Sequence, residues 1–191
     1  TNITVVLQSY EFNNNYTRVL IFTNTVKVWR YNTMGDYWLY DIIANKLTKM
    51  GKKLLPQSLM FAKFSPDGKD VAYVSEHNIY SEDISNGEIT KLTKDGTRKL
   101  INGTFDWVYE EEFNCRDGFR WSPDGTMIAF WQVDATKIKD YYMLNTTDSN
   151  YSQVIPVEYP KVGESPSAVK IGVVNINTKN VKWMDIAGDP Q

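Results

Sequence analysis

An eight-residue pattern that occurs twice constrains the fold of this chain more than any other feature. Residues 61–68 read Phe-Ala-Lys-Phe-Ser-Pro-Asp-Gly, and residues 118–125 read Gly-Phe-Arg-Trp-Ser-Pro-Asp-Gly. Each copy is followed by an apolar run, at residues 70–74 and 127–131. Repetition of this kind indicates that one supersecondary unit is used several times in a fold. The chain is therefore expected to contain several copies of one unit.

The shared Ser-Pro-Asp-Gly motif predicts a tight turn between two strands. A type I turn prefers these residues: a serine that accepts a local hydrogen bond, a proline with a preset φ, an aspartate, and a glycine where φ can become positive. A degraded third copy is predicted at residues 10–22, where three asparagines at positions 13–15 replace the motif and still suit a turn. The alternative is an unrelated β-sandwich that happens to use two such turns.

A second hairpin is predicted in each unit. The expected strand pairs are residues 38–42 with 45–48, 78–84 with 87–93, and 170–176 with 181–184. Two hairpins make four antiparallel strands, and a spacing of roughly 50 residues between turns is close to that of propeller blades. We therefore predict an all-β fold: a partial β-propeller of about three four-stranded antiparallel blades, with a short helical insertion.

The predicted units divide the chain as one domain fragment, residues 1–191. They are residues 10–50, 61–95 and 118–186, with the insertion at residues 102–115. Propellers need about four or more blades to close their ring, so we expect the chain to be part of a larger propeller. Within the third unit, residues 141–163 combine polar residues with two prolines and are expected to form a long irregular connection.

Composition and charge exclude several classes of function. With 21 Lys+Arg against 23 Asp+Glu, the net charge of −2 gives no electrostatic case for binding nucleic acid or an anionic membrane. The one histidine, His77, excludes a zinc site built on several histidines, and the one cysteine, Cys115, cannot close an intrachain disulfide. No stretch approaches the ~18–20 apolar residues of a membrane span. Neither a metal nor a cofactor is expected.

The insertion carries three successive glutamates at residues 110–112. Asp106 is a good helix N-cap, and carboxylates in the first turns of a helix are stabilised by its dipole, so a helical turn carrying the glutamates is predicted. A charge run is usually a solvated face. Carboxylates held between the aromatic residues Trp107, Tyr109 and Phe113 would also suit an ammonium group or a metal ion, or a catalytic acid/base pair. Residue chemistry alone leaves these interpretations open.

The insertion resembles the double-glutamate motif in the propeller domain of dipeptidyl peptidase IV, a serine exopeptidase of the prolyl oligopeptidase class. The residues that carry the resemblance are 106–112, Asp-Trp-Val-Tyr-Glu-Glu-Glu. Their context is similar as well, with Trp-Arg at residues 29–30 leading to Tyr-Asp at 40–41, and Tyr-Pro-Lys-x-Gly at 159–163. The resemblance runs from about Trp29 to Asn175 and is weak before Trp29.

The resemblance implies that the propeller binds the free N-terminus of a peptide, while a separate C-terminal α/β-hydrolase domain cuts the bond. In the family the last two glutamates of the motif bind the α-ammonium group, which places this role on Glu111 and Glu112. Arg30 would hydrogen-bond a carbonyl of the peptide near the scissile bond, and Glu110 is assigned no contact. The supporting residues would be Asp106, Trp107 and Tyr109.

The resemblance also implies what the whole protein does. It would be a serine-type dipeptidyl aminopeptidase with a preference for Xaa-Pro, located outside the cytoplasm and, in a bacterium, in the periplasm. This chain has no Gly-x-Ser-x-Gly nucleophile elbow and should be inactive alone. The implied partners are peptides with a free N-terminus and the hydrolase domain, with a homodimer as a further option. The alternatives are a non-enzymatic propeller that acts as a protein-interaction scaffold and a carbohydrate-binding propeller.

Overall fold

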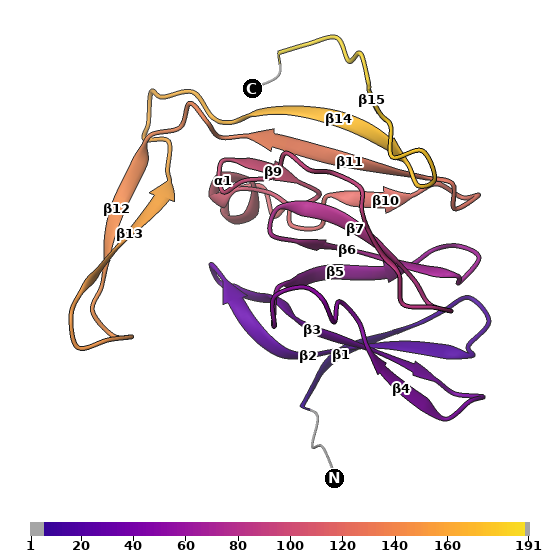
Figure 1. Cartoon of the computed structure of the whole chain (residues 1–191). Coiled ribbons are helices and arrows are strands. Elements are labelled where there is room, and N and C mark those ends of the chain that lie inside the picture. The colour runs from indigo at the N-terminus through magenta and orange to yellow at the C-terminus, as the bar shows by residue number, and fades with distance from the viewer. Residues whose placement is uncertain (1–5, 190–191) are drawn as a thin grey trace.

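The fold is almost entirely β-structure. The computed structural model describes residues 6–189, which form fifteen strands and one short helix. Figure 1 shows the sheets stacked in chain order, from the N-terminal strands to the C-terminal strands, with one hairpin standing apart from the stack. Over the described residues, no helix is long and apolar enough to cross a membrane.

The first blade consists of four antiparallel strands. They are β1 (Leu7–Phe12), β2 (Arg18–Val28), β3 (Tyr31–Asp41) and β4 (Lys46–Lys49). The predicted asparagine turn joins β1 to β2: the side-chain oxygen of Asn13 accepts hydrogen bonds from the backbone N–H groups of Thr17 and Arg18, at 2.9 and 3.0 Å. The degraded copy of the repeat therefore forms the same kind of turn as the intact copies.

The second blade contains the first Ser-Pro-Asp-Gly turn. Its strands are β5 (Leu59–Phe64), β6 (Asp70–Ser75), β7 (Asn78–Asp83) and β8 (Ile89–Lys91). The N–H of Gly68 donates to the carbonyl of Ser65 at 2.9 Å, and Gly68 has φ +70°, so the predicted tight turn is confirmed. A short pairing of Met34 and Gly35 in β3 with β5 joins the first two blades into one eight-stranded sheet.

The third blade repeats the pattern around the second Ser-Pro-Asp-Gly turn, where Gly125 N–H donates to the Ser122 carbonyl at 2.9 Å. Its strands are β10 (Phe119–Trp121), β11 (Met127–Asp134), β14 (Ala168–Asn175) and β15 (Val181–Trp183), and the short β9 (Leu100–Asn102) pairs with the far end of β11. The three copies predicted from the sequence are therefore three antiparallel blades, and the expected partial propeller is confirmed.

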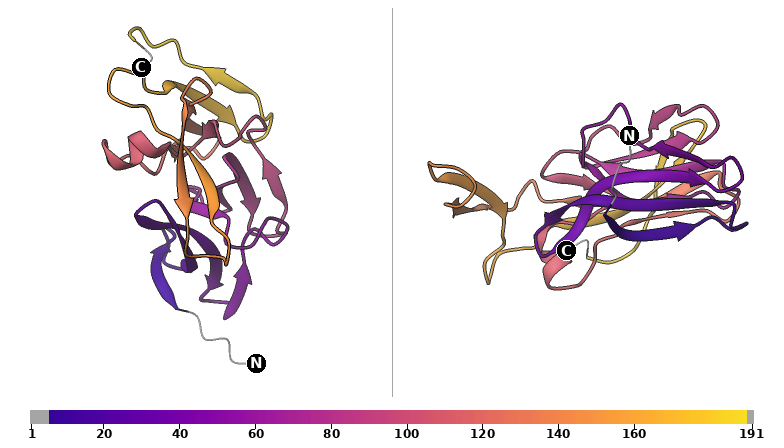
Figure 2. Two further views of the ribbon diagram at one scale, coloured as in Figure 1. Left: turned by 90° about the vertical axis from the view of Figure 1, so that its left-hand side faces the viewer. Right: turned by 90° about the horizontal axis from the view of Figure 1, so that it is seen from below.

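The segment between β11 and β14 corrects one expectation. Instead of an irregular connection, residues 141–163 contain most of a β-hairpin of β12 (Asp140–Asn145) and β13 (Gln153–Glu158). The hairpin projects away from the blades (Figures 1 and 2). The prolines suggested an irregular chain, but Pro156 lies in β13 opposite Tyr142. A two-stranded ribbon has only edge strands, and an edge strand tolerates a proline because its outward N–H needs no partner.

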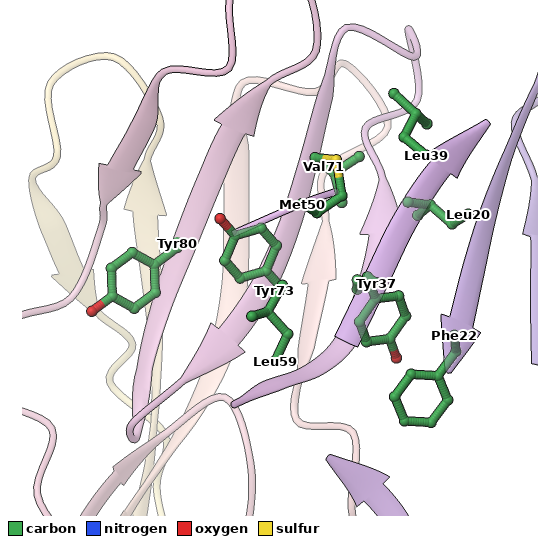
Figure 3. Packing of buried hydrophobic residues seen from close by; sticks show 10 residues of the cluster. Leu20, Phe22, Tyr37, Leu39, Met50, Leu59, Val71, Tyr73 and Tyr80 are labelled. Atoms are coloured by element: carbon green, nitrogen blue, oxygen red, sulfur yellow. The ribbon is translucent and has the colours of Figure 1, made fainter. Parts of the chain in front are cut away.

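The core lies between neighbouring blades. Figure 3 shows the apolar cluster between the first and second blades, with Leu20, Phe22 and Tyr37 on one side and Leu59, Val71 and Tyr73 on the other. A second cluster joins the second and third blades. Strand β6 is buried at five successive positions because both of its faces are covered, whereas β11 alternates between exposed and buried residues along much of its length.

A third, smaller cluster positions the insertion. Ile101, Phe105 and Val133 are its buried members, and Tyr109 and Cys115 pack against it. These side chains place the only helix of the described residues, α1 (Trp107–Glu111), on the side of the molecule from which the β12–β13 hairpin projects.

Candidate substrate-binding site

Helix α1 begins at the N-cap predicted from the sequence. Asp106 has extended backbone geometry, and its Oδ1 accepts a hydrogen bond from the N–H of Tyr109 at 3.2 Å. The other oxygen, Oδ2, accepts from the hydroxyl of Ser167, which lies just before β14. Asp106 is buried, so both oxygens are used where water cannot replace a lost partner. The cap therefore fixes the start of α1 against the third blade.

Aromatic contacts hold the rest of α1. Trp107 packs on Tyr159 with 4.5 Å between the ring centroids, so the Tyr-Pro-Lys-x-Gly stretch lies beside the acidic motif. Tyr109 contacts Phe105 at 5.8 Å and Phe113 at 5.6 Å. Aromatic pairs at such distances contribute about 0.5–1.5 kcal/mol each beyond the area they bury. The glutamates thus lie on a helix anchored on more than one side.

The three glutamates have different surroundings. Glu110 is 1% exposed, and its Oε2 is buried without a hydrogen-bond partner among the described residues. Burial raises the pKa of Glu110 to about 8; nearby Arg116 lowers the pKa, and Glu111 and Asp106 raise it. Glu112 is the C-cap residue and is exposed. A continuous solvated acidic face does not fit this arrangement, since its first member is fully buried.

Glu111 is paired with Arg30. Its side chain is 4% exposed, and Oε2 forms a salt bridge with Nε of Arg30, whose own side chain is 76% exposed. The other oxygen, Oε1, is buried and has no hydrogen-bond partner within residues 6–189. The fold therefore brings together two of the three predicted binding residues from distant parts of the sequence.

Arg30 is carried by the turn of a long hairpin. Val28 pairs with Tyr31, so Trp29 and Arg30 form a two-residue connection between β2 and β3, and Trp29 has φ +55°. Positive φ is uncommon outside glycine. This backbone conformation closes the turn with the right-handed twist of the flanking strands, and it presents Arg30 at the tip of the hairpin.

A pocket of about 460 Å³ lies beside the Arg30–Glu111 pair. Its lining includes Trp29 and Trp107, and the β12–β13 hairpin adds a mostly apolar wall of Met143, Leu144, Asn145, Ile155 and Val157. This wall was missed by sequence reasoning because the hairpin itself was not expected. A larger pocket of about 540 Å³ lies at the base of the hairpin, and its lining includes none of the glutamates at 110–112.

Arg116 is the other site residue that sequence reasoning missed. Its guanidinium carbon lies 3.7 Å from the centroid of the Tyr31 ring, and it donates hydrogen bonds to the Asn114 side chain and to the carbonyl of Glu110. No motif singled it out, and its place shortly after the glutamates was the only signal. Within residues 6–189, no group of three or more His, Cys, Asp or Glu side chains could hold a metal ion.

Comparison with known proteins identifies the family. Residues 13–191 match the family model of the dipeptidyl peptidase IV N-terminal region. The chain belongs to this family. The match includes residues 13–28, where the sequence resemblance to dipeptidyl peptidase IV was weak.

Two fungal proteins and one bacterial structure of this kind are similar to the chain. It is 31% identical to the probable dipeptidyl-aminopeptidase B of Penicillium rubens over 90% of its length and 36% identical to dipeptidyl aminopeptidase B of Saccharomyces cerevisiae over 76%. The crystal structure of Porphyromonas gingivalis dipeptidyl peptidase 4 superposes with a TM-score of 0.89 at 30% identity, covering 96% of this chain and 26% of that one. The chain spans 20% and 18% of the two fungal proteins.

Proposed function

We propose that this chain is the part of a dipeptidyl aminopeptidase that binds the free N-terminus of a peptide substrate. In this proposal Glu111 and Glu112 bind the α-ammonium group, and Arg30 donates a hydrogen bond to a carbonyl of the bound peptide. The observation that carries the proposal is Oε1 of Glu111, which is buried and unpartnered within the described residues. An unsatisfied buried acceptor costs roughly 1–3 kcal/mol. A ligand that brings N–H donors to this oxygen recovers that free energy.

The chemistry of the pocket suits an α-ammonium group. A free α-amino group has a pKa of about 7.7–8.0, and a neighbouring carboxylate raises it further. The indole rings of Trp29 and Trp107 line the same pocket, and aromatic faces attract cations. Because the side chain of Arg30 is largely exposed, it can leave Oε2 of Glu111 without disturbing the core. The ammonium then takes its place and Arg30 turns to the peptide carbonyl.

Binding the terminal ammonium at a fixed position sets the length of the product. Only a limited number of residues can extend from Glu111 and Glu112 to a nucleophile held elsewhere, so the carboxylates select for release of a dipeptide. An internal peptide segment offers no ammonium group. It would leave the buried carboxylate without a partner, which is the kind of mismatch that gives strong discrimination.

The remaining activity belongs to parts of the protein outside this chain. We propose that a C-terminal α/β-hydrolase domain supplies a serine nucleophile and the Xaa-Pro preference, and that the three blades are part of a larger propeller. The similar fungal proteins bear the name dipeptidyl aminopeptidase and are about five times as long as the matched region, which supports a further domain. We also propose an extracytoplasmic location, periplasmic in a bacterium, which cell fractionation checks, and a homodimer.

Hydrolysis of Gly-Pro-p-nitroanilide by the full-length protein tests the proposal. Glu111→Gln, Glu112→Gln and Arg30→Ala should each lower kcat/KM at least tenfold, which is about 1.4 kcal/mol of transition-state binding. N-acetyl-Gly-Pro-p-nitroanilide should not be cleaved by the wild type, because it carries no ammonium group. Glu88→Gln is the matched control, since Glu88 is an exposed glutamate between β7 and β8. This variant should cleave the substrate as the wild type does.

Two outcomes would overturn the proposal. If Glu111→Gln and Glu112→Gln keep the wild-type kcat/KM, the glutamates do not bind the N-terminus of the substrate and the domain acts as a scaffold. If the acetylated substrate is cleaved as well as the free one, the amine is not recognised by any part of the protein.

A further inference from the structure

The hairpin tip that carries Arg30 extends beyond its neighbouring strands. β1 pairs with β2 only as far as Thr23, and β5 pairs with β3 only at Met34 and Gly35. Beyond these positions β2 and β3 pair only with each other, and the register shifts twice before the turn. The sheet therefore does little to fix the position of the tip, and side-chain contacts must do so.

Two side-chain contacts join the tip to the segment of α1. One is the salt bridge from Arg30 to Glu111. The other is the stack of the Arg116 guanidinium on the ring of Tyr31, with 3.7 Å between the guanidinium carbon and the ring centroid. Tyr31 follows Arg30 directly in the sequence. The second contact is thus made by the residue next to Arg30, through a ring that is attached to the backbone by a shorter side chain than that of Arg30.

Arg116 is itself held in place by hydrogen bonds to residues in helix α1 and shortly after it. Its Nη1 donates to the side chain of Asn114, and its Nη2 donates to the carbonyl of Glu110 at 3.4 Å. Asn114 has φ +59°, which turns the chain back after the helix so that Arg116 lies beside the residues it bonds. A planar guanidinium held by its edge presents a flat face, which is the geometry that stacks on an aromatic ring.

We propose that Arg116 is a positioning residue for Arg30. This inference rests on the proposed function. When the substrate ammonium binds Glu111 it competes with Arg30 for the carboxylate, so the direct salt bridge is weakened at the moment when Arg30 must meet the peptide carbonyl. No group of the substrate competes for the Arg116–Tyr31 stack. The stack therefore keeps the tip, and Arg30 with it, beside the glutamates in the substrate complex.

Kinetics of the full-length protein with Gly-Pro-p-nitroanilide test this role. Arg116→Ala and Tyr31→Leu should each lower kcat/KM about fivefold, which corresponds to about 1 kcal/mol. Tyr31→Phe should retain the wild-type value because the contact is made with the ring face. Arg116→Lys should not rescue, because an ammonium group has neither the planar face nor the paired donors of a guanidinium.

The decisive comparison is made in an Arg30→Ala background. If Arg116 acts through Arg30, Arg116→Ala should cause no further loss once Arg30 is absent, whereas a general loss of structure would lower activity in both backgrounds. Lys91→Ala is the matched control, since Lys91 in β8 lies over the ring of Tyr80 in β7 and neither residue lines the pocket beside Glu111. Tyr31 is 48% exposed, so Tyr31→Leu tests the proposal even if Arg116→Ala fails to fold.

The outcomes separate this inference from the function on which it rests. If Arg30→Ala and Glu111→Gln lose activity while Arg116→Ala and Tyr31→Leu do not, only the positioning role is overturned. The same conclusion follows if the losses from Arg30→Ala and Arg116→Ala multiply. If Arg30→Ala itself keeps full activity, both the proposed role of Arg30 and the positioning role of Arg116 are wrong.

Discussion

Glu110 is the most buried residue of the acidic motif, and its burial favours the protonated, uncharged form. Its side chain is almost fully buried, and burial raises its pKa from 4.5 to about 8. In the folded protein it therefore holds a proton at neutral pH that the unfolded chain releases. A neutral Glu110 also removes one of three neighbouring like charges. Helix α1 can then carry the ion-pairing Glu111 without the full repulsion of a triple anion.

This pKa predicts how stability depends on pH. The folded state binds the proton of Glu110 more tightly than the unfolded chain does. The stability that Glu110 contributes to the folded state is therefore fully present below about pH 4.5 and is lost as the pH rises towards about 8. Glu110→Gln, which mimics the protonated acid, should flatten this dependence and should be more stable than the wild type at pH 8.5. Urea denaturation of the full-length protein at pH 5 and pH 8.5 measures both effects. Glu88→Gln should keep the wild-type change in unfolding free energy between the two pH values. A Glu110→Gln variant that also keeps this change would contradict the prediction.

The β12–β13 hairpin lies outside the three blades and exposes several large apolar side chains. It pairs with no strand of the three blades, and a lone two-stranded hairpin is only marginally stable in water. Tyr142, Leu144 and Val154 are each more than half exposed. Its base is tied to α1 through Tyr159 and Trp107, and its inner side lines the pocket beside Glu111.

These exposed apolar side chains predict that the hairpin contributes to the proposed homodimer. Val154→Asp should shift the full-length protein from dimer towards monomer, because it places a charge where apolar surface would be buried. Val154 is 58% exposed and does not line the pocket beside Glu111. Sedimentation velocity measures the change, with Ser152→Asp in the loop of the same hairpin as control. A wild type that sediments as a monomer would show that the hairpin has no such role.

The whole molecule leaves apolar surface at both ends of the stack of blades. Tyr10 and Phe12 are exposed on β1, and Trp183 and Met184 are exposed at the end of β15. Strand β6 of the middle blade, in contrast, is buried at five successive positions. This difference is expected if further blades pack against the first and third blades in the full-length protein.

The isolated 191 residues should therefore differ from the full-length protein in two ways. They should self-associate, because exposed strand edges and apolar faces pair with other chains, and they should not hydrolyse Gly-Pro-p-nitroanilide. Light scattering and the hydrolysis assay, run on both forms, check these expectations. An isolated chain that is monomeric and as heat-stable as the full-length protein would contradict the first, and measurable hydrolysis would contradict the second.

The elements predicted correctly from the sequence are those decided by neighbouring residues. The Ser-Pro-Asp-Gly turns close through a hydrogen bond between residues three apart, as at Ser65 and Gly68, and Asp106 caps a helix turn that begins at the next residue. The β12–β13 hairpin was not predicted, because its Pro156 and its polar loop favour an irregular chain when read locally. Strand pairing along its full length outweighs those local preferences.

The three blades, the family and the acidic motif of the candidate site could be predicted from the sequence alone, because turn chemistry, caps and motifs act over short stretches of chain. The tertiary structure was needed to show that Glu110 is buried, which raises its pKa, that Glu111 pairs with Arg30, and that Arg116 stacks on Tyr31. Each of these depends on contacts between segments that are distant in the sequence. Such contacts follow from how hairpins and blades pack, and no local pattern of residues specifies them.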